Sequence, residues 1–168
     1  MIDKFDTIIE SLEKRDTLII SDKTFSNEII LDESLQCSIL GTIVFSRVDF
    51  QNVDFTGTNF VNCKFQNCIF KEMTFRKCDF WNSIFKNCLI EKSDFTRANF
   101  FDGSFQNCNI LNTNLRASSF SDFEFSEVVF NNTNLNLIDG TSIKILKKIE
   151  NSSDLGNVLK DLLKSNDA

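Results

Sequence analysis

The residues with the most distinctive chemistry in this chain are six cysteines, because the sequence contains no histidine at all. Thiolates bind soft metal ions and take part in disulfide exchange. Structural metal sites, however, are usually built from two Cys-x-x-Cys pairs, or from one such pair and histidines. No such pair occurs here. Five of the cysteines are instead separated by multiples of five residues: Cys63, Cys68, Cys78, Cys88 and Cys108. This spacing favours reduced thiols in a core, and Cys37, outside that series, is expected to be the exposed one.

Other groups give little support for an enzyme. Histidine is the commonest general base, and its absence removes that role along with the commonest metal ligand. Only five glycines are present, and they form no phosphate-binding loop. Serine, threonine and aspartate are abundant, yet each falls at a position that the repeat described next explains. We therefore expect no catalytic, cofactor-binding or metal site.

A five-residue repeat runs through the centre of the sequence. A large apolar residue recurs every five positions from Phe45 to Leu135, nineteen times without a slip. The site two residues earlier is mostly small, with Met73 and Phe123 as exceptions, and the position two residues later is often Asn, Asp or Gly. A period of five fits neither a helix nor a simple strand. It fits a chain that turns a corner every five residues, pointing one large and one small side chain inward.

The pattern resembles the pentapeptide-repeat family, with its A-(D/N)-L-x-x consensus. Stretches such as SDFTRANF and TNLRASSF match closely, and FVNCKFQNCIF is a version rich in Phe and Cys. The resemblance covers 43–137. It implies an all-β solenoid, a right-handed parallel β-helix with four pentapeptides per coil and about five coils. On that geometry Cys68, Cys88 and Cys108 stack in one column.

The ends of the solenoid need caps, because a stacked sheet leaves open edges. We expect residues 1–42 to form an N-terminal cap, with an amphipathic helix over 3–14 and short strands near 18–21 and 27–32. The five-residue spacing continues backward, but Lys23, Glu28 and Glu33 would then occupy inward sites, so we expect regular coiling to begin near residue 38.

The C-terminal segment, 138–168, is predicted to be helical. Ile143, Leu146 and Ile149 suggest one helical stretch, and Ser153 is a candidate N-cap for a second. The apolar face of that second helix comprises Leu155, Val158, Leu159, Leu162 and Leu163. Two interpretations remain open: this segment caps the last coil, or it caps the coil and also forms a homodimer.

The outward positions are where a function can be sought. Taking every twentieth residue places Val61, Trp81 and Phe101 in one outward column, with Trp81 the single tryptophan of the chain. Further outward apolar residues on other sides are Ile84, Ile69, Leu89 and Leu111. One side carries a basic stripe: Arg76, Lys77, Arg97 and Arg116. Exposed apolar ladders are typical of interaction surfaces, although they also stabilise a sheet or lie beneath the termini.

These features predict a non-enzymatic scaffold that binds a protein partner, or itself, through an apolar face. The alternative that the family suggests is protection of DNA gyrase by DNA mimicry, or immunity to a toxin or antibiotic. Mimicry requires an acidic surface. The net charge of −6 lies mainly outside the repeat, since residues 43–137 hold ten acidic and nine basic residues. This near-neutral balance argues against strong mimicry.

The remaining expectations concern location and other partners. The overall negative charge and the shortness of the basic stripe argue against nucleic-acid binding as the function. No apolar run reaches the length of a membrane span, and the first residues lack the apolar core of a signal peptide. We therefore expect a cytoplasmic protein with no membrane partner.

Overall fold

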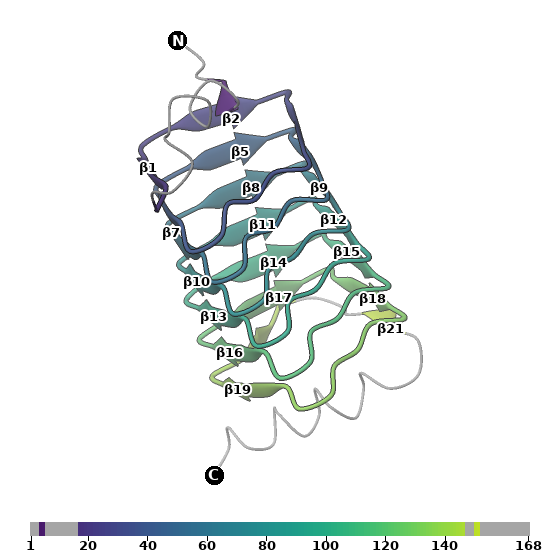
Figure 1. The fold of residues 1–168 in the computed structure, drawn as a ribbon. Coiled ribbons are helices and arrows are strands. Elements are labelled where there is room, and N and C mark those ends of the chain that lie inside the picture. Colours follow the sequence, from purple (N-terminus) through teal and green to yellow (C-terminus); the bar gives the residue numbers. More distant parts are fainter. Residues whose placement is uncertain (1–3, 6–16, 147–149, 152–168) are drawn as a thin grey trace.

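The computed structural model describes residues 4–5 and 17–146, together with the backbone of 150–151. Over these residues the chain winds as a four-sided parallel β-helix of about six turns (Figure 1). Phe80 is paired with Phe60 on one side and with Phe100 on the other, so equivalent positions recur every twenty residues. The four-sided solenoid that the repeat and the family resemblance predicted is therefore confirmed.

Three sides of the coil are seven-stranded parallel sheets, which we call sheets A, B and C. Sheet A comprises β1 (Ile19–Ser21), β4 (Ile39–Gly41), β7 (Asn59–Val61), β10 (Asp79–Trp81), β13 (Asn99–Phe101), β16 (Ser119–Ser121) and β19 (Asp139–Thr141). Sheet B comprises β2 (Thr24–Ser26), β5 (Val44–Ser46), β8 (Lys64–Gln66), β11 (Ile84–Lys86), β14 (Ser104–Gln106), β17 (Glu124–Ser126) and β20 (Lys144–Ile145). Sheet C comprises β3 (Ile29–Leu31), β6 (Asp49–Gln51), β9 (Ile69–Lys71), β12 (Leu89–Glu91), β15 (Asn109–Leu111), β18 (Val129–Asn131) and β21 (Glu150–Asn151).

The fourth side connects sheet C of one coil to sheet A of the next and is built from turns. Single parallel bridges join neighbouring coils there, as between Thr74 and Asp94. A tight turn follows each bridge, closed in one coil by the bond from the Thr58 N–H to the Phe55 carbonyl, 2.9 Å long. The main chain on this side is thus also hydrogen-bonded from coil to coil, without an extended strand.

The corners of the coil require left-handed backbone. Every corner residue among those described has a positive φ near 50–60°, for example Asn62 at 56° and Asn82 at 48°, except Gly57 at 71°. Asparagine tolerates this conformation and also forms ladders, in which the Asn82 side-chain amide donates to Asn62 Oδ1 at 2.8 Å. The turn residues that the sequence pattern identified therefore lie at the corners.

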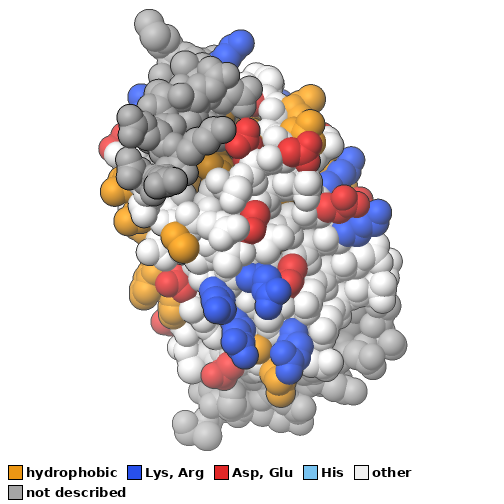
Figure 2. All heavy atoms as spheres, in the orientation of Figure 1, with side chains coloured by type: hydrophobic (Ala, Val, Ile, Leu, Met, Phe, Trp, Pro, Cys, Tyr) orange, Lys and Arg blue, Asp and Glu red, His pale blue; other side chains and the backbone are white. Residues whose placement is uncertain are grey.

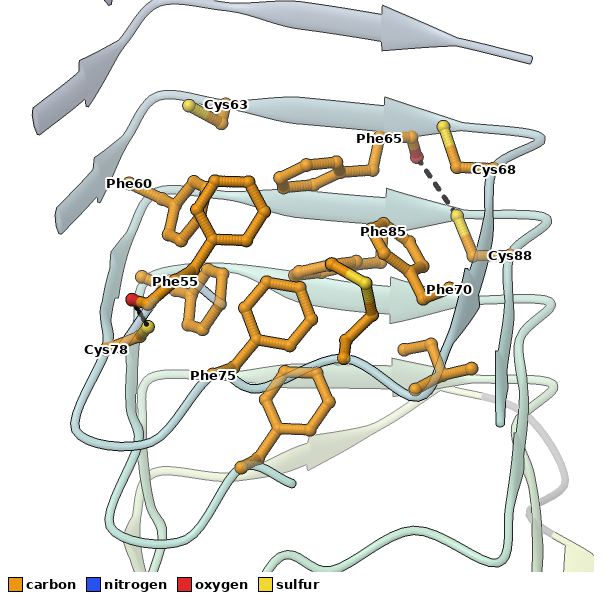
Figure 3. Close-up of a cluster of buried hydrophobic side chains, with 14 of the residues drawn as sticks. Phe55, Phe60, Cys63, Phe65, Cys68, Phe70, Phe75, Cys78, Phe85 and Cys88 are labelled. Atoms are coloured by element: carbon orange, nitrogen blue, oxygen red, sulfur yellow. Dashed lines mark hydrogen bonds between the residues drawn. The ribbon is translucent and has the colours of Figure 1, made fainter. Parts of the chain in front are cut away.

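Phenylalanine columns fill the interior. Phe80 stacks on Phe60 with ring centroids 4.7 Å apart and ring planes 6° from parallel, and Phe100 stacks on Phe120 in the same way. Rings on neighbouring sides meet edge to face, as Phe60 and Phe65 do (Figure 3). These rings are fully buried, which explains why the chain uses Phe and never Tyr, whose hydroxyl would need a partner.

Coiling begins earlier than residue 38, because β1 starts at Ile19 and six coils replace the five expected. Lys23, Glu28 and Glu33 do occupy the small inward sites, but they are only half-buried. Among the described residues, the first coil has a neighbouring coil on one side only, so these side chains are not enclosed. Phe5 packs edge to face on Phe25 at this end, and its N–H donates to Glu28 Oε2 at 3.0 Å.

At the other end, the predicted helix through Ile143 and Leu146 is wrong. The chain continues as β19 and β20, with the Lys144 N–H donating to the Phe123 carbonyl at 2.9 Å. Ile143 occupies an inward site and is buried beside Gly140, which replaces the usual large residue. Apolar spacing of three mimicked a helix where the five-residue repeat had weakened.

The other predicted terminal elements lie outside the described residues. These are the helix over 3–14, apart from Lys4 and Phe5, and the helix after Ser153 with its five apolar residues. Within the part of the chain that the structure describes, no helix is long and apolar enough to cross a membrane.

Phe123, the bulky exception at the small inward site, is accommodated by Gly103 in the preceding coil. A Cβ added at Gly103 would lie 2.8 Å from Phe123 Cε2 and 2.3 Å from the Ser83 carbonyl oxygen. Ser104, next to this glycine, is buried, unlike the other residues before a central position. The missing side chain at Gly103 and the oversized ring of Phe123 thus compensate each other.

We predict that Gly103→Ala lowers the free energy of unfolding by about 1–3 kcal/mol, because the added methyl group overlaps backbone atoms that cannot move freely. Gly41→Ala is the matched control, since its Cβ would meet only Ser21 Cβ at 3.7 Å. The control should be neutral or stabilise slightly. Urea unfolding of both variants checks this, and equal effects would contradict the proposed fit.

Candidate interaction surfaces

An aromatic ladder lies on the outer surface of sheet A. Val61, Trp81 and Phe101 follow the central Phe of their strands, so the pleat directs them to solvent, and they are paired in register. The rings of Trp81 and Phe101 stack with centroids 4.0 Å apart and planes 17° from parallel. Trp81 is 45% exposed, whereas Val61 and Phe101 are half-buried. The outward column that the spacing predicted is therefore present.

Two isoleucines lie on the outer face of the first two coils of sheet A, two residues along the strand from the column of Val61. Ile19 is 69% exposed and Ile39 is 39% exposed, and they are paired with each other in the column that precedes the central residues. We call Ile19, Ile39, Val61, Trp81 and Phe101 the apolar band. Sequence reasoning missed the isoleucines because it assigned them to the cap. The signal that could have found them is the five-residue spacing, which continues through Ile20 and Leu40.

Sheet A is also acidic. The corners before its strands, which include Lys77 and Arg97, belong to the fourth side. The strands of sheet A, each with the residue before it and the corner after it, cover 18–22, 38–42, 58–62, 78–82, 98–102, 118–122 and 138–142. These segments contain five aspartates and neither Lys nor Arg. The aspartates are Asp22, Asp79, Asp102, Asp122 and Asp139. The repeat is therefore nearly neutral only when the charges of all four sides are added together, since the segments of sheet A alone have a net charge of −5.

The carboxylates of sheet A flank the apolar band, and the segments of sheet A contain no Lys or Arg that could pair with them. Asp79 accepts a hydrogen bond from the Asn99 amide at 2.7 Å, and Asp139 accepts one from the Gly140 N–H at 2.8 Å. Asp102 and Asp122 occupy successive exposed corners. The ion pairs identified among the described residues join Arg76 to Asp94, Lys92 to Glu72 and Lys144 to Glu124, all on other sides.

The other predicted apolar residues do not join this surface. Ile84 lies on sheet B. Ile69 and Leu89 are paired on sheet C, and Leu111 is paired there with Glu91. Sheet C is separated from sheet A by sheet B along one path and by the fourth side along the other, so it faces the opposite direction (Figure 1). The predicted set of seven residues is thus divided among three sides.

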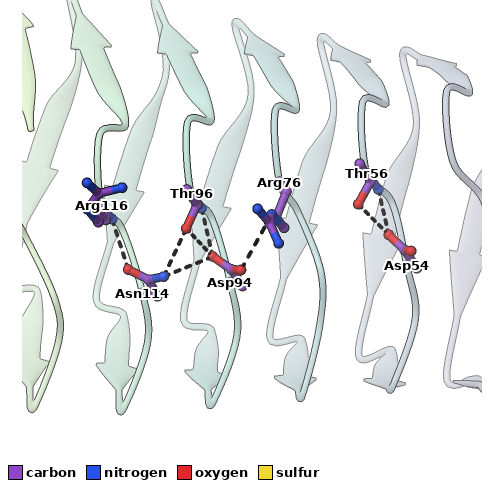
Figure 4. A network of polar contacts seen from close by, with 7 residues as sticks. All are labelled: Asp54, Thr56, Arg76, Asp94, Thr96, Asn114 and Arg116. Carbon is purple, nitrogen blue, oxygen red and sulfur yellow. Dashed lines mark hydrogen bonds and ion pairs between the residues drawn. The ribbon is translucent and has the colours of Figure 1, made fainter.

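The basic stripe lies on the fourth side, next to sheet A. Arg76, Lys77, Arg97 and Arg116 are all exposed. Arg76 Nε approaches Asp94 Oδ2 at 3.8 Å, and Asp94 Oδ1 accepts hydrogen bonds from Thr96 (Figure 4). Lys and Arg side chains gather on the near face in Figure 2, while hydrophobic side chains follow its left edge, over sheet A. Acidic and basic surfaces therefore meet along one edge of the solenoid.

The inward cysteines bond to main-chain carbonyls of the preceding coil. Cys78 Sγ donates to the Phe55 carbonyl at 2.9 Å, and Cys88 Sγ donates to that of Phe65 at 3.4 Å (Figure 3). Burial raises the pKa of Cys63 to about 11 and that of Cys78 to about 12. Hydrogen bonding to Cys108 and Cys68, above and below it, raises the pKa of Cys88. Cys37 is exposed, as expected. No group of three or more His, Cys, Asp or Glu among the described residues is arranged to hold a metal ion.

Comparison with known proteins identifies the repeat. The family model for the pentapeptide repeat region matches residues 58–135 and 78–152. A trypsin-treated form of QnrB1, a plasmid-mediated fluoroquinolone resistance protein, is 16% identical; the match covers 84% of this chain and 97% of that one, with a TM-score of 0.32. HetL from Nostoc sp. strain PCC 7120, involved in heterocyst differentiation regulation, is 12% identical over 79% and 86%, with a TM-score of 0.34. A search of curated proteins finds no match.

The buried thiols predict a loss of stability in alkali. The unfolded thiols ionise near pH 9.0, whereas the fold keeps Cys63 and Cys78 neutral up to about 11 and about 12. Their contribution is thus complete below pH 9 and is lost as the pH rises through that window, by up to about 1.4 kcal/mol per pH unit for each thiol. Urea unfolding between about pH 8 and about pH 11 measures it.

The control for this prediction is a pair of variants. Cys63→Ala with Cys78→Ala should show a smaller fall in stability with pH than the wild type. Cys37→Ala removes an exposed thiol and should keep the wild-type dependence. Identical pH dependence in all three proteins would contradict the assignment of the alkaline effect to the buried thiols.

Proposed function

This chain belongs to the pentapeptide-repeat family, and on that premise we propose that it is a non-enzymatic scaffold that binds a protein partner through sheet A. The observation that carries the proposal is the exposed Trp81 ring, stacked on the half-buried Phe101, on a sheet whose strands contain no basic residue in the segments defined above. Tryptophan is enriched among the residues that dominate binding energy at protein interfaces. A stacked pair is also already ordered, so little side-chain entropy is lost on binding.

The neighbouring surface of sheet A supports the same proposal. The apolar band crosses five consecutive coils from β1 to β13. Contiguous exposed apolar surface bordered by polar groups is characteristic of interaction sites. Its borders here are the Asn62 and Asn82 amides at the corner and the Asp79 carboxylate across the strand.

The non-enzymatic part of the proposal is supported by the contacts of the inward hydroxyl groups. Thr58 Oγ1 donates to the Leu35 carbonyl at 2.7 Å, and Ser118 Oγ donates to the Leu115 carbonyl at 2.7 Å. Both side chains are buried and donate to main-chain carbonyls, Thr58 to one in the preceding coil and Ser118 to one in its own coil. A nucleophile needs instead an adjacent base and access to substrate.

Replacing Trp81 and Phe101 together with Ser should reduce capture of the native partner at least about tenfold, because both aromatic anchors are lost. Tagged wild-type and variant proteins are compared by quantitative mass spectrometry after capture from the native host. Sedimentation velocity on the same samples detects a second copy as the partner. Ile69→Ser with Leu89→Ser, a paired set on sheet C, is the control that should retain capture. Unchanged capture and unchanged oligomeric state in the sheet A variant would refute the proposal.

Protection of DNA gyrase is a second candidate, favoured by the segregation of five aspartates onto sheet A. A protein that mimics DNA must present carboxylates to a positively charged DNA-binding site. The overall balance of the repeat argued against that role, but the placement of Asp79, Asp102 and Asp122 gives one face the required sign. This second candidate function also uses sheet A, but its partner would be DNA gyrase.

A supercoiling assay with gyrase and a quinolone tests the second candidate. If it is correct, micromolar protein restores supercoiled product, and Asp102→Asn with Asp122→Asn weakens this protection because the mimicked charge is lost. Arg97→Gln on the fourth side is the control and should protect as well as the wild type. Failure of the wild-type protein to protect at micromolar concentration would exclude this function.

A further inference from the structure

Resting on the proposed function, we propose that the part of the partner that docks on sheet A is a basic amphipathic α-helix, lying along the solenoid axis on the apolar band. The proposal follows from three properties of sheet A: the sign of its charge, the state of its backbone and the spacing of its exposed apolar side chains.

Charge selects a cationic occupant. The segments of sheet A contain five aspartates and no Lys or Arg. Their exposed corner carries Asp102 and Asp122, whereas Lys77 and Arg97 lie at the opposite corner, on the fourth side. A second copy of the chain bound face to face through sheet A would bring these carboxylates together, which is unfavourable. A partner with Lys or Arg beside its apolar residues would instead pair with Asp79 across the strand and with Asp102 at the corner. Arginine can also stack on the exposed Trp81 ring.

The backbone of sheet A disfavours recognition of an extended peptide. In β10 the Asp79 N–H donates to the Thr58 carbonyl at 3.2 Å, and the Asn82 N–H after the strand donates to the Phe101 carbonyl at 2.8 Å. These groups bond to neighbouring coils, as do those of the other interior strands. A peptide that adds to a sheet binds through unpaired main-chain groups at an edge, and the face of sheet A has none to offer. The occupant must therefore be recognised through side chains.

The spacing of the apolar band matches one face of a helix. Neighbouring strands lie about 4.8 Å apart, so the four intervals from β1 to β13 span about 19 Å along the axis, with a sideways step of two residues, about 6.6 Å, between Ile39 and Val61. A helix rises about 5.4 Å per turn and would cover that length with about 13 residues. Apolar residues three and four apart lie about 5–6 Å from each other on one helix face. Each turn of an axial helix would thus meet about one rung of the band.

Intrinsic fluorescence reports binding at this surface, because Trp81 is the single Trp and the chain has no Tyr. The probe is a peptide of about 14 residues without Trp, with Leu at helical spacing and Lys on both flanks. Two matched peptides separate charge from shape: one replaces each Lys with Glu, and one rearranges the Leu and Lys residues into a period of two. The basic helical peptide should bind at least about tenfold more tightly than either, with the difference from the Glu peptide falling at high salt.

Charge variants test the docking site while leaving Trp81 in place. Asp79→Asn with Asp102→Asn should weaken binding of the basic helical peptide by about fivefold or more and reduce its salt dependence. Glu91→Gln on sheet C is the matched control and should bind as the wild type does. Equal binding of the Lys and Glu peptides, tighter binding of the period-two peptide, or equal effects of the two sets of variants would overturn the proposal.

The outcome remains distinguishable from that of the proposed function. If the Ser variants of Trp81 and Phe101 lose the native partner while the three peptides bind alike, sheet A is the interaction surface and the helical occupant is wrong. If those variants retain the native partner, the proposed function fails. In that case, preferential binding of the basic helical peptide would show only that sheet A can bind such a peptide. The helix proposal would then fail together with the function on which it rests.

Discussion

In-register stacking of equivalent residues, twenty positions apart, is the constraint on which this molecule depends. A Phe ring such as Phe80 is held between Phe60 and Phe100 and meets the rings of adjoining sides edge to face. A change of one residue in the length of a coil would move every later side chain to another position, with inward and outward residues exchanged. The absence of proline and the left-handed corners follow from the same constraint, since each coil must donate its N–H groups to the next.

The same constraint organises the surface. Outward residues also stack from coil to coil. A side chain of one kind that recurs at equivalent positions in successive coils therefore forms a continuous column. Trp81 stacks on Phe101 to form the outward aromatic pair of sheet A, while Arg76 and Arg116 lie two coils apart on the fourth side. The acidic sheet and the basic side arise from this segregation in a chain whose repeat is nearly neutral. A rigid core thus permits the outer columns to vary in chemistry without altering the fold.

The five-residue spacing predicted a chain that turns every five residues and the inward cysteines. The four-sided coil implied by the family resemblance then placed Val61, Trp81 and Phe101 in one column. The first coil was misplaced because Lys23 and Glu28 were judged as if enclosed, whereas a terminal coil leaves them half-exposed. The spacing could not reveal the pairing of Gly103 with Phe123, since that fit depends on atoms in adjacent coils. The net charge of the repeat, summed over all four sides, also did not show that aspartates gather on sheet A. Counting charges side by side requires each residue to be assigned to a side, beginning with the first coil at Ile19.

The central claim is that sheet A presents an exposed aromatic pair within an acidic surface. Quenching of Trp81 fluorescence by a cation and by an anion tests it directly, since the chain has no other Trp. At equal ionic strength, with each ion's quenching expressed relative to its quenching of free N-acetyltryptophanamide, the wild-type protein should be quenched more strongly by caesium than by iodide, because the surrounding carboxylates concentrate cations and repel anions. Equal quenching by both ions, stronger quenching by iodide, or protection of Trp81 from both would contradict this account.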